Sequence, residues 1–150
     1  MSSGDPQAAA AAQIRALLEA RLEALRAKDA PGFIARFDSS IVKFDLAPPL
    51  RDSGPSVLDP AALQWWLDTW AGELLVDLAE LTITVDGTVA FCHCLEHIQG
   101  TRTDGERADM WTRSTLGLRK LGGAWKVTHE HSSAPFYMDG EARPALDLQP

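Results

Sequence analysis

The sequence predicts an α+β domain in which a curved antiparallel sheet packs against three N-terminal helices. Between residues 6 and 72, apolar residues recur mainly at helical spacing. From residue 73 to residue 133 they alternate with a period of two, and glycine-containing turns interrupt them. Helices that precede a run of hairpin-connected strands are expected to lie on one face of the sheet and to leave an interior between the two layers.

The composition indicates one globular domain. The chain has 150 residues, of which 45% are hydrophobic and 23% are charged, and these proportions are typical of a folded domain. We expect this domain to cover residues 1–138 and to be followed by a tail over residues 139–150. A net charge of -7 argues against a nucleic-acid surface, which would need clustered Lys and Arg.

The N-terminus and the cysteines indicate where in the cell the protein is expected. No basic residue occurs in the first six positions, and no stretch approaches about 18 uninterrupted apolar residues. Cys92 and Cys94 are too close along one strand to form an ordinary disulfide. We therefore expect a cytoplasmic protein with reduced thiols and no membrane partner.

The first two helices carry the same start signal. Asp5 followed by Pro6 is typical of an N-cap and a first helical residue. The first helix is expected to end at Lys28. Its apolar positions are Ile14, Leu17, Leu18, Leu22 and Leu25. A shorter second helix follows Asp29 and is expected to carry Phe37 at the end of its apolar side.

One strand and one loop are expected next. Residues 40–46 have strand-like character, whereas residues 47–58 contain three prolines and one glycine. A loop of this kind often forms the rim of a pocket.

The third helix supplies two candidate ligand-binding residues. Asp59 and Pro60 repeat the cap signal, and Gly72 is expected to end the helix. Trp66 and Trp70 fall on its apolar side. Tryptophans in this position most often fill a core, but one at a rim can also stack on a flat ligand.

Four strands complete the predicted sheet. They span residues 73–85, 89–98, 108–121 and 125–133. A parity switch near Ala79 predicts a bulge, and Asp86-Gly87 predicts a hairpin. Because the second of these strands is apolar or aromatic on both faces, its outer face also needs cover, and we expect a homodimer through the convex face of the sheet.

The ending Gly-Gly-Ala-Trp-Lys-Val-Thr-His129-Glu-His131-Ser-Ser, with Arg113-x-Thr115 before it, resembles the SnoaL-like and ketosteroid-isomerase-like branch of the nuclear transport factor 2-like superfamily. The resemblance covers about residues 7–136. It implies a cone-shaped, cystatin-like fold with a ligand cavity between the helices and the concave sheet face. The ending is also similar to the association domain of calcium/calmodulin-dependent kinases, a non-catalytic assembly module.

Asp45 is the first candidate catalytic residue. It lies at the end of the first strand beside the proline-rich loop, where partial burial could raise its pKa into the range of a general base. The resemblance implies the same role, because in the isomerases an aspartate just after the first strand is the base. A solvated aspartate at a strand end is the alternative.

His129, His93 and His131 are further candidates. His129 and His131 lie two apart, so both rings leave the same face of a regular strand as Trp125. One interpretation is a zinc or iron site. Its further ligands would be His93 or His97, and Glu96 or Glu130. The favoured interpretation has no metal and no cofactor. His93 faces the cavity, and one of His129 and His131 hydrogen-bonds inside the cavity or to a neighbouring strand while the other packs at the dimer face.

Arg113 and Glu130 are candidate ligand-binding residues. A guanidinium within a half-buried sheet must pair with a carboxylate or with a ligand, and Glu96, Asp109 and Glu130 are the possible internal partners. Glu130 has the opposite parity to the two histidines, so a regular strand cannot point both kinds of residue into the cavity.

These observations predict a protein that binds a hydrophobic, partly polar small molecule. It would act as a cofactor-free isomerase, cyclase or dehydratase by proton transfer, with Asp45, His93 and His129 as catalytic residues. The predicted ligand-binding residues are Trp66, Trp70, Arg113, Glu130 and His131. A non-catalytic ligand-binding or oligomerisation domain is the alternative.

Overall fold

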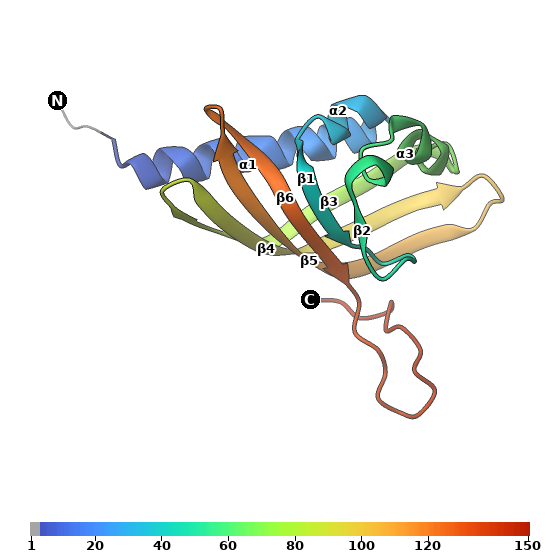
Figure 1. The fold of residues 1–150 in the computed structure, drawn as a ribbon. Coiled ribbons are helices and arrows are strands. Elements are labelled where there is room, and N and C mark those ends of the chain that lie inside the picture. Colours follow the sequence, from blue (N-terminus) through green and yellow to red (C-terminus); the bar gives the residue numbers. More distant parts are fainter. Residues whose placement is uncertain (1–3) are drawn as a thin grey trace.

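The computed structural model describes residues 4–150, and three helices lie on one side of a single curved sheet (Figure 1). The helices are α1 (Pro6–Arg26), α2 (Ala30–Ile34) and α3 (Pro60–Leu67), with a short 3-10 turn at Gly54–Ser56. The strands are β1 (Phe37–Phe44), β2 (Asp52–Ser53), β3 (Trp70–Asp86), β4 (Val89–Arg102), β5 (Arg107–Leu121) and β6 (Ala124–Ser133). The predicted α+β class is confirmed.

The strands are ordered β2-β1-β6-β5-β4-β3 across the sheet. Hairpins join β3 to β4, β4 to β5 and β5 to β6, so these pairs are antiparallel. The β1–β6 pair is parallel, which differs from the expected antiparallel sheet. Because most of the chain separates β1 from β6, no hairpin turn fixes their relative direction.

All three helix starts agree with the predicted caps. The carboxylates of Asp5, Asp29 and Asp59 each accept a backbone N–H at 3.0 Å, from Gln7, Gly32 and Ala61 respectively. Each cap satisfies a donor that the first turn would leave unpaired, and a proline follows in the first turn of each helix.

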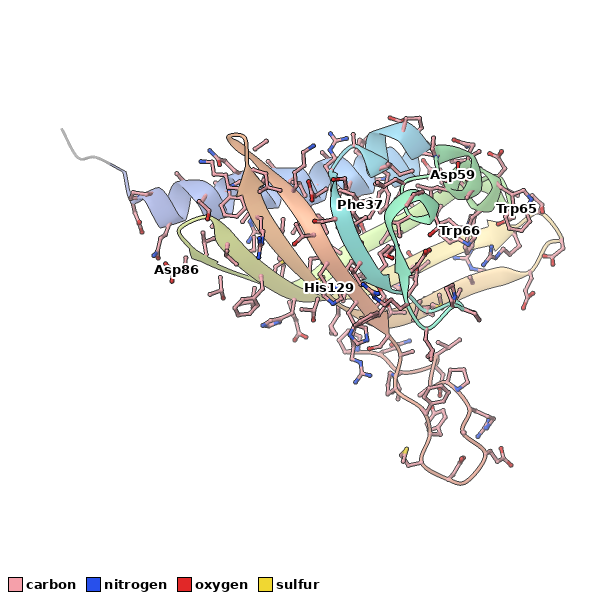
Figure 2. All side chains as sticks on the ribbon, in the orientation of Figure 1. Phe37, Asp59, Trp65, Trp66, Asp86 and His129 are labelled. Atoms are coloured by element: carbon pink, nitrogen blue, oxygen red, sulfur yellow. The ribbon has the colours of Figure 1, made fainter. Side chains whose placement is uncertain are left out.

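Two aromatic residues belong to strands rather than to the helices expected from the sequence. Phe37 begins β1, as Figure 2 shows, instead of ending α2. Trp70 begins β3 and pairs with Arg102, because α3 stops at Leu67. Gly72, expected to end the helix, instead lies at φ 71° where the β3–β4 register shifts.

The predicted bulge in β3 is confirmed. Glu80 has φ 54°, and the β3–β4 register shifts between Ala79 and Thr82. A bulge bends its strand and increases the local twist, and β3 curves beneath α1 (Figure 1).

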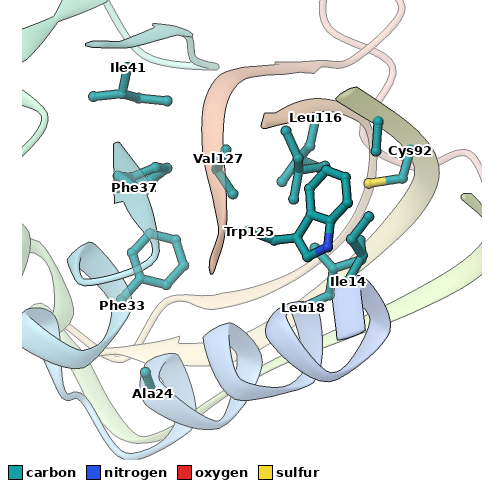
Figure 3. Packing of buried hydrophobic residues seen from close by; sticks show 12 residues of the cluster. Ile14, Leu18, Ala24, Phe33, Phe37, Ile41, Cys92, Leu116, Trp125 and Val127 are labelled. Atoms are coloured by element: carbon teal, nitrogen blue, oxygen red, sulfur yellow. The ribbon is translucent and has the colours of Figure 1, made fainter. Parts of the chain in front are cut away.

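The main core joins α1 to the middle of the sheet. Ile14 and Leu18 on α1 pack with Leu116, Trp125 and Val127 in one buried cluster (Figure 3). Burial of each such aliphatic side chain contributes about 1.5–3 kcal/mol. A second cluster at the other end of the sheet contains Ala30, Leu67, Trp70, Leu74 and Val76.

After β6 the chain extends away from the sheet and folds back on itself (Figure 1). Phe136 bridges Pro144, and the backbone N–H of Tyr137 donates to the carbonyl of Arg143 at 2.8 Å. The Tyr137 hydroxyl also donates to Asp147. Tyr137 therefore holds one part of the tail to another.

Within residues 4–150, the helices are too short or too polar to span a bilayer.

Candidate functional site

A cavity of about 550 Å³ lies between the helices, the segment 45–59 and the concave face of the sheet. We call this concave face the inner face and the opposite one the outer face. The volume falls within the roughly 300–1,000 Å³ typical of small-molecule sites. Most of the wall is apolar and comes from both layers, including Leu18, Leu22, Leu63, Val76, Ile98 and Met110.

A buried ion pair joins the two layers within the cavity wall. The Nη2 group of Arg21 on α1 donates to Oε2 of Glu130 on β6 at 2.7 Å, and the two residues are 5% and 6% exposed. The guanidinium also lies 4.7 Å from the ring centre of Phe33. The Arg21 Nε–H is buried and has no hydrogen-bond partner within residues 4–150.

Glu96 on β4 also lines the cavity. Burial raises the pKa of its carboxyl to about 7, and the nearby Glu130 carboxylate adds to the rise while Arg21 opposes it. Glu96 pairs in register with Thr112 on β5. The Thr112 hydroxyl is buried and has no hydrogen-bond partner within the described chain, whereas hydrogen bonding from the buried Ser114 hydroxyl acts to lower the pKa of Glu96. A titratable carboxyl and two buried hydroxyls thus occupy adjacent inner-face positions.

Asp45 and Lys43 lie nearer the mouth. Lys43 Nζ is 3.1 Å from Asp45 Oδ2, and the Asp45 side chain is 47% exposed. Burial acts to lower the pKa of Lys43, but the carboxylates of Glu130 and Asp45 outweigh it and raise that pKa. Lys43 therefore remains a cation that holds Asp45 at the edge of the cavity.

Trp66 and Trp70 form an aromatic wall. Their rings meet edge to face with centres 5.8 Å apart, and both line the cavity. Trp70 is buried, whereas Trp66 is 36% exposed at the rim. Figure 2 shows Trp66 and Asp59 at the α3 end of the molecule.

Four of the residues predicted as site residues line this cavity together: Asp45, Trp66, Trp70 and Glu130. His93, Arg113 and His131 do not, because they are exposed on the outer face. His129 is half-buried, but its Nδ1 is 2.8 Å from the Val42 carbonyl oxygen and its ring lies against Phe44. The expectation that His93 faces the cavity is therefore corrected. His129 also lies outside the cavity lining, but its contact with Val42 is the expected hydrogen bond of one histidine to a neighbouring strand.

A bulge in β6 explains the position of His129. Gly117 pairs with His129, but Leu118 pairs with Val127, so Thr128 is an extra residue. It switches the parity of the strand, and as a result Val127 and Glu130 are both buried while His131 is exposed. On β4 the inner face carries Cys92, Cys94 and Glu96, which places His93 on the outer face.

Two of the three expected partners of Arg113 are engaged elsewhere, and the third, Glu96, lies on the inner face while Arg113 is on the outer one. Glu130 pairs with Arg21, and Asp109 lies 2.7 Å from His97 Nε2. Within the part of the chain that the structure describes, no group of three or more His, Cys, Asp or Glu side chains is placed to hold a metal ion.

The cysteines are free and buried on the inner face. Burial raises the pKa of Cys92 to about 11 and that of Cys94 to about 12. Both thiols are therefore protonated near neutral pH and are poor nucleophiles.

Sequence reasoning overlooked Arg21 and Lys43 and considered Glu96 only as a metal ligand or a partner of Arg113. The signal for Arg21 was present, because it continues the apolar stripe of Ile14 and Leu18 at helical spacing. A charged residue in such a stripe needs a buried partner. Lys43 likewise shares the parity of buried Ile41.

Comparisons with known proteins support the same fold. The family model for the SnoaL-like domain matches residues 14–137. An NTF2-like protein of unknown function from Pseudomonas putida is 36% identical with a TM-score of 0.83, covering 95% of this chain and 98% of that one. No curated protein matches the chain.

More distant structures show the fold alone. A ketosteroid isomerase-like protein from Erwinia carotovora atroseptica is 21% identical with a TM-score of 0.67, covering 81% of this chain and 93% of that one. The association domain of C. elegans CaMKII is 17% identical with a TM-score of 0.67, covering 87% of this chain and 99% of that one. The family match over residues 14–137 and the 36% identical NTF2-like protein show that the chain belongs to the SnoaL-like family, with an NTF2-like fold.

Proposed function

We propose that the protein binds an apolar small molecule with a polar end in this cavity and transfers a proton on it without a cofactor. The supporting observation is the Glu96 carboxyl, which lines an apolar-walled cavity and forms no ion pair with any residue of the described chain. Isomerisation, cyclisation and dehydration all require a group that can take up and return a proton.

Glu96 suits this role because its pKa of about 7 lies near the working pH. A carboxyl with such a pKa is a stronger base than an ordinary glutamate and is still partly ionised at neutral pH. Arg21 and Glu130 fix the charge around it. The buried hydroxyls of Thr112 and Ser114 lie on the same face, and hydrogen bonding from Ser114 opposes the rise of the Glu96 pKa.

Asp45 is the second candidate proton-transfer group. It lines the same cavity, and Lys43 holds its carboxylate in place. Its greater exposure leaves it better solvated than Glu96, so we assign it the smaller catalytic effect. An assembly role alone has less support, because an open cavity with unpaired polar groups suits a ligand.

The test is hydrogen exchange on a bicyclic ketone, 2-tetralone, followed by NMR in D2O. Wild-type protein is expected to accelerate loss of the α-proton signal. Glu96→Gln should lose at least about 100-fold of that acceleration, while Asp45→Asn should lose less. Glu19→Gln, an exposed α1 change with the same charge effect, serves as the control. Equal activity of wild type and Glu96→Gln would refute the assignment.

Dimerisation through the outer face and a cytoplasmic location form part of the same proposal. Val89 and Phe91 on β4 are 53% and 49% exposed, and Trp111 stacks on His97 on the same face. The free cysteines fit a reducing compartment. Light scattering should give twice the chain mass for the wild type. For Phe91→Arg the dimer should be at least tenfold weaker than the wild-type dimer, which corresponds to a cost of about 1.4 kcal/mol. A monomeric wild type would exclude this interface.

A further inference from the structure

We propose that the ligand of this cavity is a cation, an apolar amine whose ammonium group pairs with the Glu96 carboxylate. This inference rests on the proposed function, since it assumes that the cavity binds a small molecule. It adds the charge and chemical class of that molecule.

The cavity wall contains more carboxyl groups than cationic side chains. Three cationic side chains line it, against five carboxyls. The cations are Arg21, Lys43 and Arg102, and the carboxyls are Asp45, Asp52, Asp59, Glu96 and Glu130. A cavity with excess carboxylate favours a positive ligand over a negative one.

All three cations already have partners. Arg21 pairs with Glu130 at 2.7 Å, and Lys43 pairs with Asp45 at 3.1 Å. Arg102 lies 3.9 Å from the ring centre of Trp70, and its Nη1 donates to the Thr69 hydroxyl at 2.8 Å. A carboxylate or phosphate ligand would have to share Arg21 and Lys43 with the Glu130 and Asp45 carboxylates, although the buried Arg21 Nε–H has no hydrogen-bond partner within residues 4–150.

Glu96 is in the opposite situation. Its carboxyl forms no ion pair within residues 4–150, yet it belongs to a largely apolar wall where an unpaired negative charge is costly. A ligand ammonium would supply the missing partner. The same ammonium can donate to further acceptors, because it has three N–H groups.

A further hydroxyl, that of Ser132 on β6, lines the same cavity and can accept from the ammonium. The Thr112 and Ser114 hydroxyls lie on the same face as Glu96, but their residues are 1% and 2% exposed and are not part of the cavity wall. Thr112 is the direct cross-strand partner of Glu96. Trp66 adds an aromatic ring at the rim, where the apolar body of the amine would enter.

Amine binding must also displace a proton from Glu96. At pH 6 most of the carboxyl is protonated, because its pKa is about 7. Amine affinity should therefore rise with pH, by up to tenfold per pH unit below about 7, and level off above it. An uncharged ligand of the same shape should show no such rise.

The experiment compares 2-aminotetralin, 2-tetralol and tetralin-2-carboxylate, which differ mainly in charge. Binding is followed by quenching of tryptophan fluorescence between pH 5.5 and pH 8.5, with wild type, Glu96→Gln and Glu19→Gln. At pH 8 the amine should bind wild type at least tenfold tighter than the alcohol, and the carboxylate should bind most weakly. Glu96→Gln should bind the amine and the alcohol alike and lose the pH dependence.

Glu19→Gln removes one negative charge, as Glu96→Gln does. If Glu19→Gln still prefers the amine, the loss of preference in Glu96→Gln is not an effect of net charge. Retained alcohol binding by Glu96→Gln would show that the variant is folded. The inference is overturned if the carboxylate or the alcohol binds wild type as tightly as the amine, or if Glu96→Gln keeps the preference. Absence of binding by all three probes would instead refute the cavity as a small-molecule site and, with it, the proposed function.

Discussion

The inner and outer faces of the sheet use polar residues in different ways. The inner face holds few polar groups, but they are buried and coupled, as in the Arg21–Glu130 pair beside Glu96. The outer face carries Arg113, His93 and His131 in exposed positions. Residue types that are common in active sites are therefore concentrated on the face that does not line the cavity. The environment of a side chain, more than its type, decides whether it can do chemistry here.

The largest expected difference concerns two arginines, Arg21, which reaches from α1 to Glu130 on the inner face, and Arg113 on the outer face. Arg21→Ala should destabilise the protein by about 3–5 kcal/mol, because it leaves the Glu130 carboxylate buried and unpaired. Arg113→Ala on the outer face should change stability far less. Urea unfolding of both variants would measure the difference. Equal losses would contradict the assignment of the two faces.

The pH dependence of stability provides the second test. The folded pKa of Glu96 is about 7, raised from 4.5, so between these values the folded protein keeps a proton that the unfolded chain loses. Stability should therefore fall as pH rises through this window, by up to about 3 kcal/mol in total. Glu96→Gln should remove this component and should be the more stable protein at pH 8.

Unfolding curves recorded at several pH values would measure this component as the difference between wild type and Glu96→Gln. Thr115→Ala, an uncharged change on the outer face, should follow the wild-type profile. Parallel profiles for wild type and Glu96→Gln would show that Glu96 titrates as an ordinary glutamate.

Two glycines offer a third and smaller test. A Cβ atom at Gly100 would lie 2.7 Å from Cε3 of the buried Trp70, whereas at Gly117 the nearest atom, Cβ of His129, is 3.5 Å away. Gly100→Ala should cost about 1–3 kcal/mol through overpacking of the cavity wall. Gly117→Ala should be nearly neutral. Thermal unfolding would compare them, and similar shifts would indicate that Trp70 can move aside.

Local signals predicted most of the fold. The three Asp-Pro or Asp-x-Pro starts, the Asp86-Gly87 turn and the bulge at Glu80 each depend on a few neighbouring residues, and all occur as expected. The end of α3 was misplaced, because Trp70 continues the helical pattern of Trp66 although it pairs with Arg102 in the sheet. Long-range pairing overrode the local pattern.

The site was harder to predict because the direction of its side chains depends on register. The extra residue Thr128 reverses the parity of β6 without leaving a glycine or proline signal in the sequence. Trp66, Trp70, Asp45 and Glu130 could be chosen as cavity residues from position and type. Glu96 could not be distinguished from His93, since both faces of β4 carry apolar residues next to polar ones.

The parallel pairing of β1 with β6 has a consequence for biosynthesis. Residues 37–44 pair early with β2 but find their second sheet neighbour only when residues 124–133 have left the ribosome, and Arg21 meets Glu130 across 109 positions. Contacts of such long sequence separation slow folding, so the nascent chain must keep its first three helices without their final support until β6 has been made. A chain cut before Ala124 would lack the strand that joins β1 to β5.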